Sequence, residues 1–214
     1  SDRQMQVVSE RTIDLESVPI LRSHVLDGHA VVPMVLIMEW LCESALQRSP
    51  GLLVRGIEDL RLLKGIVLRD TQSSEVRLRA GAMTRRDGEF IVPVDLVGTM
   101  NPNGRDVTHA RANVVLGNSL GQGSADAGGL RLSPLRLSTE SIYREILFHG
   151  PELQGLLQVE GQGERLISAR VATSPSPSRW LQAPRRREWL TDPLAIDCAF
   201  QLVVLWCRES LGVN

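Results

Sequence analysis

Two histidines, an Asp-Gly step and a proline lie within the stretch HVLDGHAVVP, residues 24–33, directly before a long apolar run. The imidazole of His24 can remove a proton near neutral pH, because histidine is the side chain that ordinarily changes charge there. Backbone N–H groups at the mouth of a helix can polarise a nearby carbonyl group. The stretch therefore combines a candidate base with a candidate oxyanion site, although a lone histidine is more often held by local backbone contacts.

A carboxyl group and an amide stand four residues apart in the run DPLAIDCAFQLVVLW, residues 192–206. At that spacing on a helix, Asp197 and Gln201 lie on one face. Burial among apolar neighbours raises the pKa of a carboxyl group, so a protonated Asp held by an amide is a candidate general acid. The simpler alternative is an acidic residue near a helix N-terminus that interacts favourably with the helix dipole.

These side chains need elements that hold them in place. From Pro33 to about Gln47 the sequence is apolar nearly all round, with a proline at the first turn, and this predicts a buried helix. One strand is expected before this helix, several follow it, and an Asp-Gly step at residues 87–88 predicts a hairpin between two of them. The expected strands cover residues 6–15, 52–63, 75–83, 89–99 and 107–117. This order describes a hot dog, in which an antiparallel sheet curls around one helix.

The segment GNSLGQGSADAGG, residues 117–129, has no apolar periodicity and predicts a linker. A second unit follows, with a short helix at about residues 139–147 and a second apolar helix that Asp192 caps and Pro193 opens. Strands are expected near residues 153–160 and 166–173. We therefore predict an N-terminal domain at residues 1–117, a linker at 118–135 and a C-terminal domain at 136–214. We expect the chain to be a piece of a longer polypeptide.

Three motifs in this order resemble those of the dehydratase domains of polyketide and polyunsaturated fatty acid synthases. They are His24-x-x-x-Gly28-x-x-x-x-Pro33, the segment HGPELQG at residues 149–155, and Asp197-x-x-x-Gln201. The resemblance spans nearly the whole chain and implies an α+β double hot dog, whose second hot dog is incomplete at the C-terminus. In this family one half supplies a histidine and the other an aspartate to a shared tunnel, and by position these are His24 and Asp197.

The resemblance also implies supporting roles. Gln201 would hold the Asp197 side chain, while Gly28 and the start of the helix at Pro33 would supply backbone N–H groups to the substrate oxygen. The substrate tunnel would be shaped by His149, Gly150, Pro151 and Leu153. Two points stay open, since His149 either contacts substrate or packs, and Leu153 stands where the family commonly has phenylalanine.

The implied reaction is dehydration of a 3-hydroxyacyl thioester, carried on the phosphopantetheine of an acyl carrier protein, to a 2-enoyl thioester. We expect no metal and no cofactor, because the thioester is itself the electron sink. Two alternatives remain. One is an aldol cyclase like the product-template domains, and the other is a catalytically silent dehydratase-like scaffold domain.

Composition limits the partners and the compartment. A formal charge of −1 gives no electrostatic case for nucleic acid or a membrane surface. The three cysteines lack metal-ligand spacing and lie in apolar stretches, so we expect a reducing, cytoplasmic compartment. By the resemblance, the partners would be an acyl carrier protein and other domains of a megasynthase. A homodimer is a further possibility, because hot-dog sheets have edges that need covering.

Overall fold

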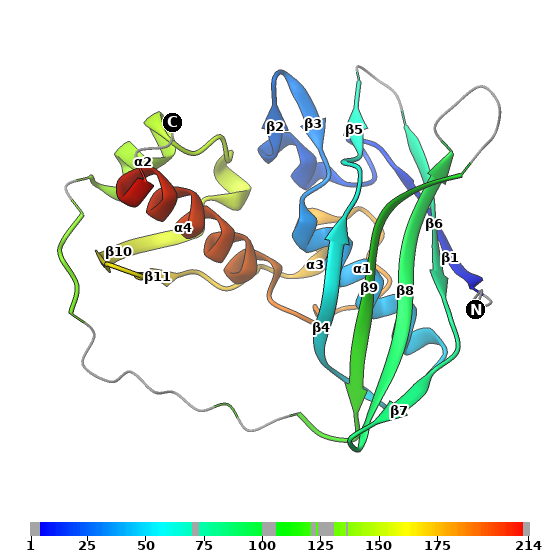
Figure 1. Cartoon of the computed structure of the whole chain (residues 1–214). Coiled ribbons are helices and arrows are strands. Elements are labelled where there is room, and N and C mark those ends of the chain that lie inside the picture. The colour runs from blue at the N-terminus through cyan, green and yellow to red at the C-terminus, as the bar shows by residue number, and fades with distance from the viewer. Residues whose placement is uncertain are drawn as a thin grey trace.

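The first half of the chain is an antiparallel sheet curled around one helix, α1 (Met34–Gln47), as Figure 1 shows. The computed structural model describes residues 5–69, 73–99, 106–120, 123, 131–135 and 137–211. The strands lie in the order β1-β6-β8-β9-β4, and β7 pairs with β8. Their bounds are β1 Gln6–Ile13, β4 Leu53–Leu62, β6 Ser74–Ala80, β7 Thr84–Arg86, β8 Glu89–Thr99 and β9 Asp106–Gly117. The predicted helix and strands are present, with differences of a few residues at their ends.

Helix α1 is buried because it is apolar on almost every side. Pro33 occupies its N-cap position, and the Pro33 carbonyl accepts the N–H groups of Leu36 and Ile37. The side chains of Leu36 and Trp40 are 0% and 1% exposed against the concave face of the sheet. Burying a large apolar side chain of this kind stabilises a fold by about 1.5–3 kcal/mol. The sheet therefore fixes α1 firmly.

Two Asp-Gly steps make the same kind of turn. Asp87 and Gly88 have φ angles of 51° and 84° and join β7 to β8, as predicted. Asp27 and Gly28 have φ angles of 50° and 79° and join β2 (Val25–Leu26) to β3 (His29–Val31). Positive φ at both central residues is typical of the tight hairpin turn.

The second hairpin is an addition to the sequence prediction, which treated this stretch only as the approach to a helix. Strand β3 also pairs with β5 (Val67–Leu68), so a small three-stranded sheet lies beside the mouth of α1. The short 3-10 helix η1 (Pro19–Ser23) leads into it. These strands are two or three residues long, which is too short for an alternating apolar pattern to reveal them.

The second half places a two-stranded hairpin against a long helix, α4 (Pro193–Leu211). As predicted, Asp192 caps this helix, since its Oδ1 accepts the N–H of Ala195 at 3.1 Å. The remaining elements are α2 Thr139–Glu145, η2 Pro151–Leu153, β10 Leu156–Gly163, β11 Leu166–Val171 and α3 Pro177–Trp180. In Figure 1, α4 lies above β10 and β11, on the opposite side of α1 from the large sheet.

The end of the predicted linker lies along the second hairpin. Ser133 and Gln162 exchange two backbone hydrogen bonds, of 2.7 and 2.9 Å, which align residue 133 with β10. Most of the Gly- and Ser-rich segment lies outside the described residues, so the domain boundaries stay a prediction. Helices α1 and α4 contact each other, and buried side chains of both halves form one hydrophobic cluster. No helix among the described residues is long and apolar enough to cross a membrane.

Candidate active site

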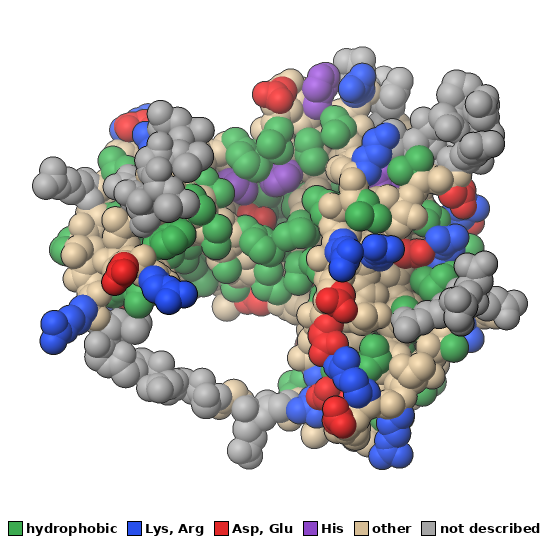
Figure 2. Space-filling view, viewed as in Figure 1, with side chains coloured by type: hydrophobic (Ala, Val, Ile, Leu, Met, Phe, Trp, Pro, Cys, Tyr) green, Lys and Arg blue, Asp and Glu red, His purple; other side chains and the backbone are tan. Residues whose placement is uncertain are grey.

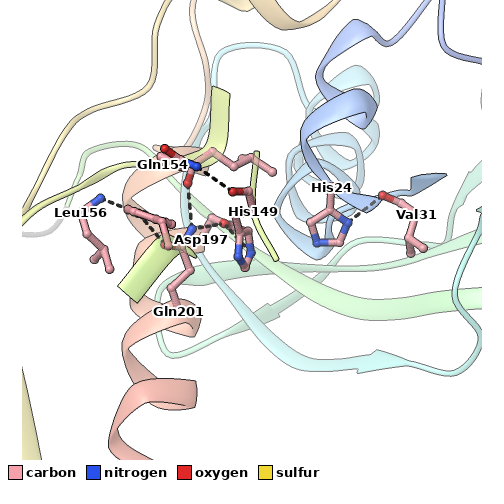
Figure 3. A network of polar contacts seen from close by, with 9 residues as sticks. His24, Val31, His149, Gln154, Leu156, Asp197 and Gln201 are labelled. Atoms are coloured by element: carbon pink, nitrogen blue, oxygen red, sulfur yellow. Dashed lines mark hydrogen bonds and ion pairs between the residues drawn. The ribbon is translucent and has the colours of Figure 1, made fainter. Parts of the chain in front are cut away.

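His24 is held by the strand that follows it. Its Nδ1 lies 2.8 Å from the carbonyl oxygen of Val31, and its own carbonyl accepts the Val31 N–H at 3.0 Å (Figure 3). A carbonyl oxygen can only accept, so Nδ1 carries the hydrogen and Nε2 keeps its lone pair. Burial lowers the pKa of the imidazole. His24 is therefore oriented as a neutral base with Nε2 available.

The HGP motif lies directly beside His24. His24 and His149 form an isolated antiparallel bridge, and the N–H of Gly150 donates to the carbonyl of Ser23 at 2.8 Å. A Cβ at position 150 would stand 2.8 Å from the Ser23 Cα. Only glycine allows the two backbones to come this close, and this contact joins the two halves of the site.

Asp197 lies on the second turn of α4 and is 5% exposed. Its Oδ2 accepts a hydrogen bond of 2.8 Å from Gln201 Nε2 and lies 3.4 Å from His149 Nε2. Burial raises the pKa of this carboxyl group to about 6, against the opposing effect of the Gln201 hydrogen bond. Both contacts use Oδ2, which leaves Oδ1 for a substrate group.

Gln201 is oriented by a chain of hydrogen bonds. Its Nε2 also donates to the carbonyl of Leu153 at 2.9 Å, and its Oε1 accepts from the Tyr143 hydroxyl at 2.8 Å. That hydroxyl in turn accepts the N–H of Leu156 at 2.8 Å. Sequence reasoning missed Tyr143, although it is the only tyrosine of the sequence and lies in a predicted helix.

His149 stands between the candidate base and the candidate acid. Its ring centroid is 5.7 Å from that of His24, and Phe148 stacks on it at 4.2 Å while meeting the His24 ring edge-on at 5.0 Å. Burial, reinforced by the nearby His24, lowers the pKa of His149 to about 4. Its carbonyl accepts from Gln154 Nε2 at 3.0 Å. A neutral His149 therefore separates His24 from Asp197, a placement that the sequence left open.

The other predicted site residues lie in the core, in a short helix and in a hairpin turn. The Leu153 side chain is 0% exposed in the core, and Pro151 begins the short helix η2. Gly28 lies at the exposed tip of the β2–β3 hairpin, four residues along from His24. The structure thus brings together His24, His149, Gly150, Asp197 and Gln201 and leaves Gly28 in a turn.

The group lies in a hollow between the two halves. Figure 2 shows hydrophobic surface lining this hollow, with histidine side chains visible inside it. The exposed apolar residues of the elements on either side include Val25, Leu26, Val67, Phe148, Phe200, Val203 and Val204. In the described ranges, no group of three or more His, Cys, Asp or Glu side chains is placed to hold a metal ion. The arrangement suits proton transfer beside an apolar ligand.

Comparison with known proteins identifies the relatives of this chain. Residues 1–93 match the family described as the polyketide synthase dehydratase domain. Over 219 aligned residues the chain is 29% identical to one component of the polyunsaturated fatty acid synthase of Thraustochytrium sp.. The first part of the chain is thus similar to polyketide synthase dehydratase domains, and nearly all of the chain is similar to a part of this synthase component. The alignment covers 96% of the chain but only 7% of that much longer synthase polypeptide.

Solved dehydratase domains share the fold. The domain from the CurF module of the curacin polyketide synthase superposes with a TM-score of 0.68 at 20% identity, covering 91% of this chain and 68% of that one. The domain of the polyketide PpsC from Mycobacterium tuberculosis gives a TM-score of 0.63 at 20% identity, covering 95% and 69%. The predicted double hot dog is thereby confirmed.

Proposed function

We propose that this chain dehydrates a 3-hydroxyacyl thioester, carried on the phosphopantetheine arm of an acyl carrier protein, to a 2-enoyl thioester. One observation best supports the proposal. The two halves of the chain place a neutral histidine and a carboxyl group of raised pKa in the same hollow. His24 is the proposed base and Asp197 the proposed acid. The dehydratase relatives support the same class of reaction, that of a hydro-lyase.

The base acts on C2 of the substrate. The thioester carbonyl acidifies the C2 proton, and Nε2 of His24 takes it with its free lone pair. Electron density moves toward the thioester oxygen, where backbone N–H groups stabilise the developing charge. The start of α1 after Pro33 is the proposed source, because the first N–H groups of a helix have no partners within it. Gly28 was predicted to assist, and its place at the hairpin tip gives it a turn role in our proposal.

The acid acts on C3. Protonated Asp197 donates its hydrogen to the 3-hydroxyl group, the C3–O bond breaks, and the leaving group departs as water. The double bond forms between C2 and C3, His24 ends with the added proton and Asp197 ends ionised. Return of the proton from His24 to Asp197 restores both groups. Gln201 keeps the Asp197 carboxyl oriented through Oδ2 throughout.

The surroundings of the dyad form the proposed tunnel wall, to which we assign His149, Gly150 and Pro151. Leu153 was predicted to join them, and its place in the core gives it a supporting role in our proposal, because its carbonyl accepts from Gln201. The chemistry as proposed uses no metal or redox cofactor, since the thioester accepts the electrons. The proposed partners are the acyl carrier protein and neighbouring domains of a megasynthase. Cys42, Cys198 and Cys207 are free thiols, which suits the cytoplasmic compartment that we propose.

The test is the loss of water from a 3-hydroxyacyl thioester, presented on an acyl carrier protein or on a short pantetheine mimic and followed by mass spectrometry. We expect turnover by the wild-type chain, and a loss of roughly 10²–10⁴-fold in His24→Ala and in Asp197→Asn. His29→Ala is the matched control, because His29 lies on the same hairpin outside the dyad and its loss should leave the rate near normal.

The outcomes separate the alternatives. Near-normal turnover in either dyad variant would contradict the assignment of that residue. If the folded chain released no water from substrates of several chain lengths, the cyclase or the silent scaffold would become the better explanation. A cyclised product from a polyketone substrate would then identify the chain as an aldol cyclase.

A further inference from the structure

Helix α1 contains a carboxyl group that the proposed reaction does not use. Glu39 lies on the second turn of α1 and is 1% exposed, within the hydrophobic cluster that surrounds this helix. Burying a carboxyl group is costly unless hydrogen bonds compensate for the lost water. A buried glutamate in this position therefore needs hydrogen-bond donors for its carboxyl oxygens.

The partners of Glu39 belong to the other half of the chain. Its Oε1 accepts the N–H of Leu190 at 2.6 Å, and its Oε2 accepts the N–H and the hydroxyl of Thr191 at 3.0 and 2.8 Å. All three donors lie on two consecutive residues, and none belongs to a basic side chain. The carboxyl group thus clamps a short stretch of backbone and makes no ion pair in this contact.

The clamped stretch leads directly into the acid-bearing helix. Thr191 precedes Asp192, the cap of α4, whose Oδ1 also accepts the N–H and the hydroxyl of Ser174 at 2.9 and 2.7 Å. Asp197 follows on the second turn of α4. At its other end, α1 begins after Pro33, two residues beyond Val31, whose carbonyl holds the His24 ring. Glu39 therefore ties the segment before the acid-bearing helix to the helix that follows the His24-holding strand, as a second connection beside the direct contacts of His149.

We propose that Glu39 is a positioning residue, which sets the place of the Asp197 carboxyl relative to His24 by fixing the start of α4 on α1. This inference rests on the proposed function for its kinetic consequence, whereas its structural consequence can be measured without substrate. A reacting group that moves by about 1 Å can lose about a hundredfold in rate. A modest shift of α4 would therefore lower kcat more than it would change KM.

The helix provides its own control. Glu43 lies one turn further along α1, and its carboxyl group pairs with Arg11 of β1 within the first half. Glu43→Gln removes a carboxylate from the same helix without touching the contact with Leu190 and Thr191. Glu39→Gln keeps the shape of the side chain but turns an amide N–H toward backbone donors, so it breaks the clamp with little change in volume. Thr191→Val removes only the hydroxyl donor and provides a milder variant that should fold.

The kinetic experiment compares kcat and KM of the full chain on a 3-hydroxyacyl pantetheine thioester. We expect Glu39→Gln to lower kcat by about ten- to a hundredfold while KM changes by less than about threefold. Thr191→Val should lower kcat less, and Glu43→Gln should leave both constants near the wild-type values. An equal loss of kcat in Glu39→Gln and Glu43→Gln would overturn the proposal, because it would show a general loss of packing around α1.

The second measurement uses no substrate. The Nε2 of His149 contacts Asp197, so the ¹⁵N signals of histidine-labelled protein report where that carboxyl lies. We expect Glu39→Gln, and Thr191→Val to a smaller degree, to shift the His149 signal and its titration, and Glu43→Gln to leave them unchanged. An unchanged His149 signal in folded Glu39→Gln would overturn the positioning role. If the signal shifts while the wild-type chain releases no water, positioning stands and the proposed reaction fails.

Discussion

Helix α4 carries Asp197, and helix α1 follows the hairpin that holds His24, but the two helices are packed differently. The concave sheet covers α1, whose Leu36 and Trp40 are at most 1% exposed. Helix α4 has one buried side and one open side, where Val203 and Val204 are 56% and 49% exposed. His24 therefore lies near the start of a helix that the large sheet covers, whereas Asp197 lies on a helix that packs along one face only.

This difference shows how each half keeps its functional group in place. The first half relies on apolar packing, with a single hydrogen bond from His24 to Val31 orienting the ring. The second half relies on polar contacts, because Gln201 and His149 meet Asp197 directly and Glu39 clamps the segment before α4. Hydrogen bonds are directional, so a few of them can fix a helix that is packed on one side only. We expect the two halves to respond differently to the same substitution.

Equal truncations in the two helices test the contrast most strongly. Leu36 of α1 and Leu205 of α4 are 0% and 1% exposed, so Leu36→Ala and Leu205→Ala remove the same atoms from equally buried sites. Such truncations lower the free energy of unfolding by about 2–5 kcal/mol, depending on how far the neighbours relax. We expect Leu36→Ala near the top of this range and Leu205→Ala near the bottom, as measured by urea unfolding. A larger loss for Leu205→Ala would reverse the comparison.

The pH profile tests the polar contacts of the second half. The proposed reaction needs Asp197 protonated, and its pKa in the free protein is about 6, so kcat/KM should fall about tenfold per pH unit above that value. On the acid side, kcat/KM should fall as His24 becomes protonated, at a pKa below the usual histidine value.

Gln201→Met tests which group is responsible for each limb of this pH profile. The Gln201 hydrogen bond lowers the pKa of Asp197, so its removal should raise that pKa and move the alkaline decline to higher pH. A hydrogen bond to a charged group is worth about 1.5–3 kcal/mol, which bounds the shift. The acid limb, which belongs to His24 in the other half, should stay in place. A shift of the acid limb alone would contradict the assignment of the two groups.

The contact between the halves is tested at Gly150. Gly150→Ala places a Cβ 2.8 Å from the Ser23 Cα, and the two backbones must separate to admit it. Overpacking of this kind costs about 1–3 kcal/mol in the free energy of unfolding. We expect thermal unfolding to show this loss together with a slower dehydration. Gly65→Ala is the control, since a Cβ there meets nothing within 4 Å. Equal losses of stability at both glycines would show that the close approach of Gly150 to Ser23 is not the cause.

The smallest effect is expected on the open side of α4. Val203→Ser should change the free energy of unfolding by no more than about 0.5 kcal/mol, because the side chain is 56% exposed. Val35→Ser on α1 is the counterpart, and its burial at 1% exposure should make it far more costly. Chemical denaturation of both variants measures the difference. A costly Val203→Ser would show that this side of α4 is covered in solution.

Much of the fold follows from local patterns. The apolar run after Pro33, the alternating strands and the Asp-Gly turn at residues 87–88 predict the first half closely, and Asp192 with Pro193 predicts the start of α4. The small β2–β3–β5 sheet was missed, although Asp27 and Gly28 gave the same turn signal as the hairpin that was recognised. Strands of two or three residues bury too little to leave a periodic pattern.

The candidate site is predictable only in part. Asp197 and Gln201 could be named because they stand at helical spacing, and His24 could be named because three motifs together resemble those of dehydratase domains. His149 was named as a tunnel residue that either contacts substrate or packs, and Tyr143 and Glu39 were not named as site residues. Their importance depends on contacts with Asp197, Gln201 and Thr191, which arise only when distant segments meet.

Residue type and local periodicity are properties of short segments, so they were enough to name candidate residues and to place Asp197 and Gln201 on one helix. Only the packed chain shows that His149 stands between His24 and Asp197, that Gly150 must be small, and that Glu39 ties the start of α4 to α1. These facts depend on the register and distance of segments more than a hundred residues apart, as in the contact between Glu39 and Thr191. No local pattern encodes such distances, because they result from how the whole core packs.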